Sequence, residues 1–186
     1  TAEQAVYVWN GTQYISWNGT VGALTNGIIP PMNGFFVKAL NPNKSWIIIP
    51  PSARVHSNVP FYKESISNLL ELELTGNNYS DVTFIHFNSE ASAGFDAHSD
   101  ARKLRGIEAA PQLFSYAGGK QLSINEQPFE PGLVIELGFT CGESGNFILN
   151  IKGLESFNNN VRILLVDQKE GIFQNLSDIV QYSFSY

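Results

Sequence analysis

The sequence predicts an all-β protein: an antiparallel β-sandwich or jelly roll with one short helix and an N-terminal β-hairpin region. Charged residues are only 15% of the 186 residues and aromatic residues are 12%, a balance that favours strands over helices. Short apolar stretches recur every 8–12 residues or so, with turn signals between them. No long helical period and no internal repeat is visible. We place the sandwich at residues 67–186 and an N-terminal β region at residues 1–55.

The N-terminal region carries the clearest turn signals. One Asn-Gly pair follows the apolar run at residues 6–9, and a second follows the run at residues 14–17. Asn-Gly between alternating apolar residues is the strongest short-range hairpin signal, because a type I′ turn needs positive φ at both central residues. We therefore predict a hairpin with a further turn over residues 5–24. Further strands are predicted at residues 34–39 and 45–49, flanked by paired prolines that cannot donate to a ladder.

The second region alternates in the manner of half-buried strands. Residues 70–74 place a leucine at every second position, and residues 82–87 begin with the same alternation, which is typical of a strand with one buried face. Residues 91–104 break this pattern, so we predict a loop with a short helix over residues 97–104. The remaining strands are predicted at residues 112–116, 121–124, 133–139, 146–151, 161–167 and 182–186.

Charge and cysteine content exclude several functional classes. The net charge is −6 and no run of Lys or Arg occurs, so we expect no nucleic-acid partner and no attraction to anionic membranes. No apolar run approaches the roughly 18 residues of a membrane span. The single cysteine, Cys141, excludes a disulfide framework and a cysteine-rich zinc site. We interpret Cys141 as a small buried hydrophobic residue.

Four aromatic residues are the candidate ligand-binding set. They are Trp9, Tyr14, Trp17 and Trp46. Sugar rings stack on exposed aromatic faces, and Trp and Tyr combine contact area with a polar group. Trp9 and Trp17 lie on facing strands of the predicted hairpin and could pair on one face. The alternative is that these rings fill the core or the seam to a neighbouring module, because an exposed seam would imitate a binding patch.

Asp96 and Asp100 are the candidate metal ligands. Carboxylates at this spacing in a loop can coordinate calcium, which takes six to eight oxygens. The alternative is that Asp96 caps the predicted helix at residues 97–104 and Asp100 pairs with a nearby Arg or Lys. The three histidines lack ligand spacing, so zinc is not expected. Calcium is therefore the only cofactor that the sequence suggests.

Catalytic motifs are absent from the sequence. No Gly-x-Ser-x-Gly nucleophile elbow occurs. Two carboxylates that flank a glycosidic bond need only spatial proximity, so the sequence alone leaves that arrangement open. Glu71 and Glu73 alternate with leucines on the predicted outer face of a strand, where contact with solvent is the expected role. We therefore expect a protein that is not an enzyme.

A series of short motifs runs through nearly the whole chain. They are Val6–Tyr14, Gly27–Lys38, Phe87-Asn88, Gly94–Asp96, Asp100-Ala101, Lys103-Leu104, Pro111–Leu113, Ser123–Asn125, Leu164–Lys169, Asn175-Leu176 and Tyr182–Phe184. Together they resemble a recurring stretch of large secreted proteins of Bacteroidota that the type IX secretion system exports. The resemblance implies that residues 1–55 are the tail of a preceding module. It also implies that the second region is a β-sandwich without catalytic residues, located before a C-terminal sorting domain.

These observations lead to one functional expectation and two alternatives. The chain begins at Thr1 without a signal peptide, and no sorting domain follows Tyr186, so we expect a fragment excised from a longer protein. We expect a non-catalytic structural or adhesive module of an extracellular or cell-surface protein. Its expected partners are neighbouring modules of the same polypeptide, and a glycan or protein at the cell surface. The alternatives are a carbohydrate-binding module of a polysaccharide-degrading enzyme and a glycoside-active hydrolase domain.

Overall fold

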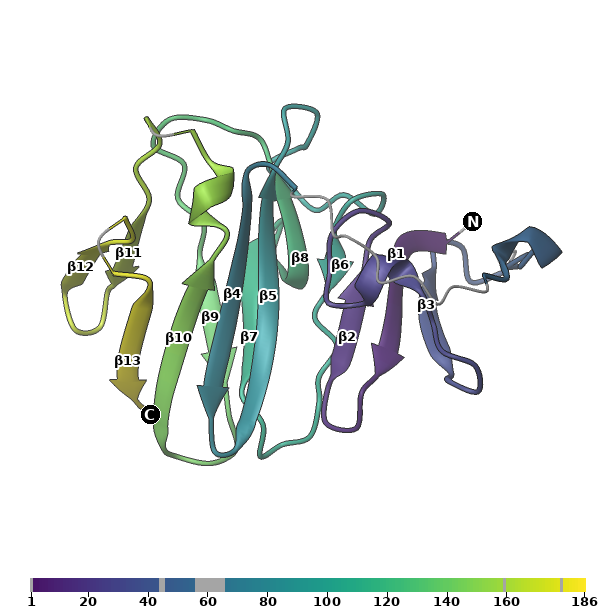
Figure 1. Ribbon diagram of the computed structural model, residues 1–186, viewed down its shortest axis with the longest axis horizontal. Helices are drawn as coiled ribbons and strands as arrows, with labels where there is room; N and C mark the ends of the chain where they lie inside the picture. The colour runs from purple at the N-terminus through teal and green to yellow at the C-terminus, as the bar shows by residue number, and fades with distance from the viewer. Residues whose placement is uncertain (1, 44–45, 56–65, 159, 178) are drawn as a thin grey trace.

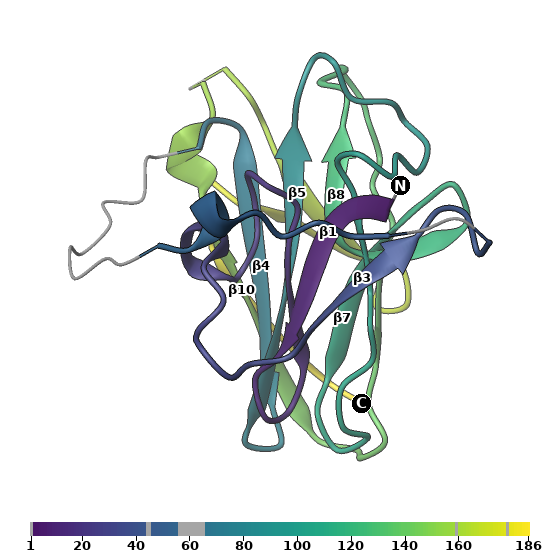
Figure 2. The ribbon, with the colours of Figure 1, turned by 90° about the vertical axis from the view of Figure 1, so that its right-hand side faces the viewer.

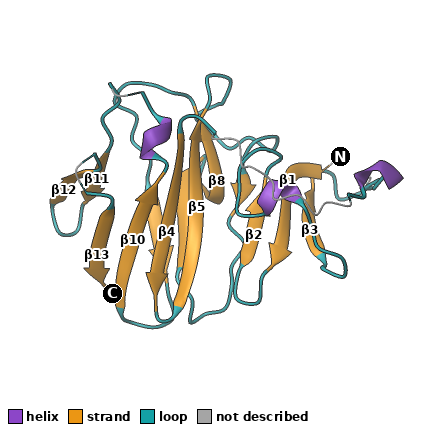
Figure 3. Cartoon of the chain, in the orientation of Figure 1, coloured by secondary structure: helices purple, strands orange, loops and turns teal. Residues whose placement is uncertain are grey.

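The structure is a computed structural model that describes residues 2–43, 46–55, 66–158, 160–177 and 179–186. Strands are the main regular structure of the described chain, with three short 3-10 helices and no α-helix (Figure 1, Figure 3). The predicted all-β class is therefore confirmed. The elements are β1 (Ala2–Trp9), β2 (Tyr14–Trp17), η1 (Thr25–Gly27), β3 (Phe35–Ala39), η2 (Pro51–Ala53), β4 (Leu69–Gly76), β5 (Tyr79–Phe87), β6 (Ala101–Arg102), β7 (Gln112–Ala117), β8 (Lys120–Gln127), β9 (Leu137–Thr140), β10 (Asn146–Lys152), η3 (Leu154–Ser156), β11 (Leu164–Asp167), β12 (Ile172–Asn175) and β13 (Gln181–Ser185). None of the helices in the described part is long and apolar enough to cross a membrane.

The main sheet has the order β13-β10-β4-β5-β8-β7-β9, and β6 pairs with β8 beside this path. Its ladders are antiparallel with one exception, the parallel pair of β5 and β8, in which Phe84 lies opposite Ile124. A parallel pair needs a crossover connection. Residues 88–119, which include β6 and β7, supply that connection. The sheet is therefore mixed where an antiparallel sheet was predicted.

The main sheet curls until its two ends face each other. In Figure 1, β7 and β9 lie behind β4 and β10. The ring of Phe139 on β9 lies 5.3 Å from the ring of Phe147 on β10 and 5.1 Å from that of Phe184 on β13, measured between ring centroids. The curled sheet encloses the larger core, formed by Leu70, Leu72, Leu74, Ile85, Leu113, Phe147, Leu149, Ile151 and Leu176. This two-layered arrangement is the predicted sandwich.

The N-terminal region forms a separate three-stranded sheet, in the order β2-β1-β3. Figure 2 shows this sheet in front of the main sheet. The two sheets share a second core, made of Ala5, Tyr7, Val21, Phe84, Ala101 and Ile124. A buried hydrogen bond of 2.9 Å between the hydroxyls of Ser16 on β2 and Ser123 on β8 also joins the two sheets. The N-terminal hairpin is thus packed on the sandwich, as predicted.

The two Asn-Gly signals form turns of the same geometry. The Asn10 side-chain oxygen accepts hydrogen bonds from the backbone N–H groups of Thr12 and Gln13, at 3.0 and 2.8 Å. Asn18 repeats this arrangement with the residues two and three positions further on. Each asparagine thus builds an Asx turn that closes a four-residue loop. The glycine that follows each asparagine has a positive φ, +110° for Gly11, which glycine adopts without steric cost.

Two predicted elements are wrong. Residues 97–104 form no helix: the Asp100 N–H donates to the Asp96 carbonyl at 2.8 Å, and Ala101 and Arg102 then pair with β8 as β6. The predicted strand at residues 45–49 is also not formed over its described part, Trp46–Ile49. Prolines follow this run directly, and proline cannot donate to a ladder.

Candidate functional site

Three aromatic rings gather at the end of the N-terminal sheet. Trp9 on β1 lies opposite Tyr14 on β2, and their ring centroids are 5.0 Å apart with an interplanar angle of 60°. Phe36 on β3 meets Tyr14 edge-on, at 5.5 Å and 86°. Trp9 is 39% exposed and Phe36 is 56% exposed. We call these three residues the aromatic tip. Its rings are tilted against one another, so they do not form one flat platform.

Trp17 does not join the aromatic tip. It lies opposite Val6, whereas Trp9 lies opposite Tyr14. Residues 14 and 17 are three positions apart on one strand, so their side chains point to opposite faces of the sheet. The Trp17 indole packs on Gly27, where a Cβ would lie 2.6 Å from the indole nitrogen. The expected pairing of Trp9 and Trp17 on one face is therefore wrong, because the hairpin loop sets a different register.

Trp46 lies in an exposed stretch that follows β3. We call residues 40–55 the N-terminal arm, and every residue of it that the structure describes is exposed. Trp46 is 71% exposed, and Ile47, Ile48 and Ile49 are each more than half exposed. In Figure 1 the arm extends at the right, beyond the N-terminal sheet and away from the main sheet. The arm thus presents four consecutive large apolar side chains to solvent.

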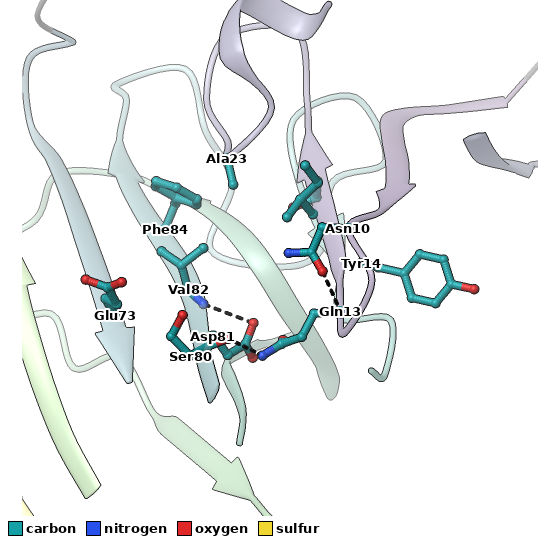
Figure 4. A pocket seen from close by; sticks show the side chains of 11 residues that line it. Asn10, Gln13, Tyr14, Ala23, Glu73, Ser80, Asp81, Val82 and Phe84 are labelled. Atoms are coloured by element: carbon teal, nitrogen blue, oxygen red, sulfur yellow. Dashed lines mark hydrogen bonds between the residues drawn. The ribbon is translucent and has the colours of Figure 1, made fainter. Parts of the chain in front are cut away.

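A small cleft of about 100 Å³ lies at the seam between the N-terminal sheet and the sandwich (Figure 4). Gln13 closes it: its side-chain amide donates to the carbonyl oxygens of Ser80 and Pro111, the latter at 3.2 Å. The amide oxygen of Gln13 is buried and has no hydrogen-bond partner among the residues that the structure describes. Figure 4 shows the Tyr14 ring directed away from the other lining side chains. The polar groups at this seam chiefly hold the two sheets together.

A buried ion pair lies close to the same seam. Lys103 and Asp81 form a salt bridge in which the side chains are 1% and 5% exposed. Asp81 also accepts from the backbone N–H of Leu113 at 2.6 Å. Burial raises the pKa of Asp81 and lowers the pKa of Lys103, while each partner opposes the shift of the other. The pair links β5, β7 and the segment after β6, and its charges are enclosed by the fold.

The two candidate metal ligands are both engaged with backbone groups. The Asp96 carboxylate accepts from the His98 N–H at 2.8 Å. Asp100 is fully buried and accepts from the N–H groups of Asp96 and Glu126, at 2.7 and 2.8 Å. Burial raises the pKa of Asp100 to about 6. Asp96 therefore caps a turn instead of a helix, and Asp100 binds backbone donors instead of an Arg or Lys.

The surroundings of Asp100 do not complete a metal site. Glu126 lies next to it and is held by the Nδ1 of His86 at 3.0 Å and by the side-chain amide of Asn18 at 3.3 Å. Within the residues that the structure describes, no group of three His, Cys, Asp or Glu is arranged to hold a metal ion. His86 on β5 thus serves as a partner of Glu126. His56 lies outside the described residues.

The remaining polar candidates have structural partners. Glu71 and Glu73 on β4 share the ammonium of Lys152, at 3.0 and 2.9 Å. The hydrogen bonds that Lys152 donates to Glu73 and Glu71 raise the pKa of its ammonium. Cys141 is half-buried, and its thiol donates to the Ala109 carbonyl at 3.4 Å. The two glutamates are thus paired with Lys152, and Cys141 is bound to a backbone carbonyl.

Sequence reasoning missed two contributors to the exposed apolar surface. Phe36 belongs to the aromatic tip, and the run Ile47–Ile49 continues the surface from Trp46. The signal for the second was present, because three isoleucines directly precede two prolines. Because that run was predicted to be a strand, its side chains were not expected to be exposed. No comparable signal marks Phe36, whose position follows from the pairing of β1 with β3.

Comparison with known proteins gives one match. No curated protein and no solved structure matches the chain. A family model matches residues 2–186, so the match runs through both the N-terminal sheet and the sandwich. That family is described as a domain of unknown function, DUF8693. The chain belongs to this family.

Proposed function

We propose that the chain is a non-catalytic structural or adhesive module of a larger secreted or cell-surface bacterial protein. The apolar surface at its N-terminal end, made of the aromatic tip and the arm, carries this proposal. Large apolar areas in water mark sites of contact with other macromolecules. Aromatic side chains are also enriched at such interfaces. The charged groups inside the fold, by contrast, are bonded to one another and to the backbone.

The cellular setting rests on sequence resemblance. The motifs between Val6 and Phe184 resemble modules of Bacteroidota proteins that the type IX secretion system exports. We propose the same setting for this chain, with an extracellular or cell-surface location. Neighbouring modules of the same polypeptide are then the first partners to consider. A net charge of −6 without a basic run agrees with partners other than nucleic acid.

Carbohydrate binding is the second candidate. Trp9 supports it, because this ring is partly exposed beside the polar turn that begins at Asn10. A sugar ring could stack on Trp9. The interplanar angle of 60° to Tyr14 leaves Trp9 as a single stacking surface. Weak binding of one sugar unit is the form that this candidate would take.

Beads that display the chain provide the test. Beads carrying the wild-type chain are expected to adhere to Bacteroidota cells and to lose adhesion with the double substitution Trp9→Ala, Phe36→Ser. The matched control is Val134→Ser, which removes a side chain that is 84% exposed but lies outside the aromatic tip and the arm. A glycan array, read with calcium and with a chelator, separates the two candidates.

The outcomes of this test distinguish the structural or adhesive role from the carbohydrate-binding role. Adhesion without glycan binding supports the structural or adhesive role. Saturable glycan binding that Trp9→Ala abolishes supports the carbohydrate-binding role. Loss of that binding in chelator adds a calcium ion, for which Asp96 and Asp100 are the residues to substitute. Adhesion that survives the double substitution contradicts the role given to the aromatic tip.

A further inference from the structure

We propose that the N-terminal arm docks on the C-terminal hairpin of a second copy of the chain, so that copies associate head to tail. The proposal rests on the proposed function, because it names a partner for the same apolar end. It requires an apolar arm, an apolar acceptor surface at another place on the molecule, and complementary charge. The described residues supply the two apolar surfaces, and the sequence supplies the charges.

The arm is the first of these features. Trp46, Ile47, Ile48 and Ile49 are consecutive, and each is more than half exposed. A run of three or four exposed apolar residues is unfavourable in a soluble protein unless it serves a contact. The two prolines after Ile49 disfavour its incorporation into a ladder of its own sheet. The arm is therefore available to a partner.

The acceptor surface lies on the C-terminal hairpin of β11 and β12. Val166 pairs with Phe173 across this hairpin, so both side chains lie on the same face, together with Leu164. Phe173 is 74% exposed, and Leu165 on the opposite face packs against the larger core. Ile179 and Val180 are exposed beside the hairpin, held there by a hydrogen bond from Gln174 to the Ile179 carbonyl. We call these five exposed residues (Leu164, Val166, Phe173, Ile179 and Val180) the C-terminal apolar surface.

The positions of the two surfaces decide the kind of contact. In Figure 1 the arm lies at the right end of the longest axis of the molecule, and β11 and β12 lie at the left end. One chain cannot bring its own arm to its own hairpin across the sandwich. The contact therefore forms between copies, and it joins two different surfaces. Contacts of this kind give chains or rings of subunits instead of closed symmetric dimers.

Formal charges favour the same pairing. The arm, residues 40–55, carries two basic side chains and no acidic one: Lys44 and Arg54. Residues 154–186 carry four acidic and two basic side chains: Glu155, Asp167, Glu170 and Asp178, with Arg162 and Lys169. Opposite charges steer two surfaces together and penalise wrong partners. An arm-to-arm contact would gather four cations and no anion, so the arm is better matched to the hairpin end.

Complementation between two variants tests the proposal. The arm variant is Trp46→Ser, Ile48→Ser, and the hairpin variant is Val166→Ser, Phe173→Ser. All four side chains are exposed in the single chain, so both variants are expected to fold, which circular dichroism checks. In sedimentation velocity, the wild-type chain is expected to gain mass with concentration beyond a dimer and to dissociate as salt is added. Val134→Ser is expected to behave as the wild type does.

The decisive sample is the equimolar mixture. Each variant alone is expected to remain a monomer, whereas the mixture forms a 1:1 dimer, because one intact arm meets one intact hairpin. A wild-type chain that stays monomeric at every concentration overturns the proposal. A mixture that stays monomeric while the wild type associates overturns the head-to-tail arrangement. Bead adhesion by a chain that never self-associates would retain the proposed function and reject the second copy as its partner.

Discussion

Replacing Lys103 by methionine tests how the N-terminal side of the sandwich is held together. Lys103 follows β6 and forms its ion pair with Asp81 on β5, where both side chains are almost fully buried. Methionine retains most of the volume of lysine and removes its charge. The Asp81 carboxylate is then left in the interior without a counter-charge. Breaking a buried pair in this way costs about 3–5 kcal/mol.

The remaining contacts of Asp81 set the magnitude within that range. Its carboxylate still accepts from the backbone N–H groups of Leu113 and Val82, at 2.6 and 2.9 Å. These donors offset part of the lost attraction, so we expect a loss of about 3 kcal/mol, or roughly a hundredfold in the unfolding equilibrium. Burial already raises the pKa of Asp81, and loss of Lys103 raises that pKa further. The loss of stability is therefore expected to be larger at pH 7 than at pH 5.

Urea unfolding at both pH values provides the assay, because the midpoint and slope give the free energy of unfolding. The control is Lys169→Met, whose side chain is 82% exposed and whose effect should stay within about 0.5 kcal/mol. Adding Asp81→Asn to Lys103→Met is expected to recover stability, because the amide is neutral and its oxygen can still accept from Leu113. A Lys103→Met chain as stable as Lys169→Met would refute the reasoning. Strict additivity of the two substitutions would refute it too.

Three further perturbations follow from the same contacts. Gly76→Ala would place a Cβ 2.2 Å from the Phe147 ring, whereas Gly34→Ala meets no atom within 4 Å; thermal unfolding should show a loss of about 1–3 kcal/mol for the first substitution and almost none for the second. Tyr7→Phe removes the hydroxyl that accepts from the Arg102 N–H at 2.7 Å, and leaving that donor unpaired should cost about 1–2 kcal/mol in urea unfolding. Burial raises the pKa of Asp100 to about 6 from its usual 3.8, so the folded chain binds the proton more tightly than the unfolded chain. The stability that Asp100 contributes is full below pH 3.8 and is lost as the pH rises through 6, by up to about 3 kcal/mol; urea unfolding of the wild type against Asp100→Asn should show this slope, and parallel pH curves would contradict it.

Local patterns predicted the elements whose burial depends on their own alternation. Leu70, Leu72 and Leu74 alternate with polar residues, and β4 buries those three leucines in the larger core. The Asn-Gly pairs at residues 10–11 and 18–19 predicted the positions of the hairpin turns. The predicted type I′ geometry is wrong, because only the glycines have positive φ and each asparagine builds an Asx turn in a four-residue loop. These signals lie within a few residues of the structure that they determine, so a sequence can reveal them.

Long-range pairing decided the elements that were predicted wrongly. Two aspartates four positions apart, such as Asp96 and Asp100, are compatible both with the start of a helix and with the turn that forms. The turn forms because Ala101 pairs with Ile124, which is distant in the sequence. No residue near Asp96 or Asp100 in the sequence predicts that pairing. The run Ile47–Ile49 has the composition of a strand but has no ladder in the described structure. The exposure of this run depends on the arrangement of the whole chain. The apolar surface formed by the aromatic tip and the arm depends on that arrangement too, so local patterns could not predict it.

Hydrogen–deuterium exchange of the N-terminal arm tests most directly the claim that the apolar N-terminal end is a contact surface. Backbone amides of the arm are compared in the dilute isolated chain and in the larger secreted protein of which we propose that the chain is a module. Rapid exchange in the isolated chain and slow exchange in the larger protein are expected, with β4 and β10 equally protected in both samples. Equally rapid exchange of the arm in both samples would contradict the claim, because the surface would then remain in water where the protein works.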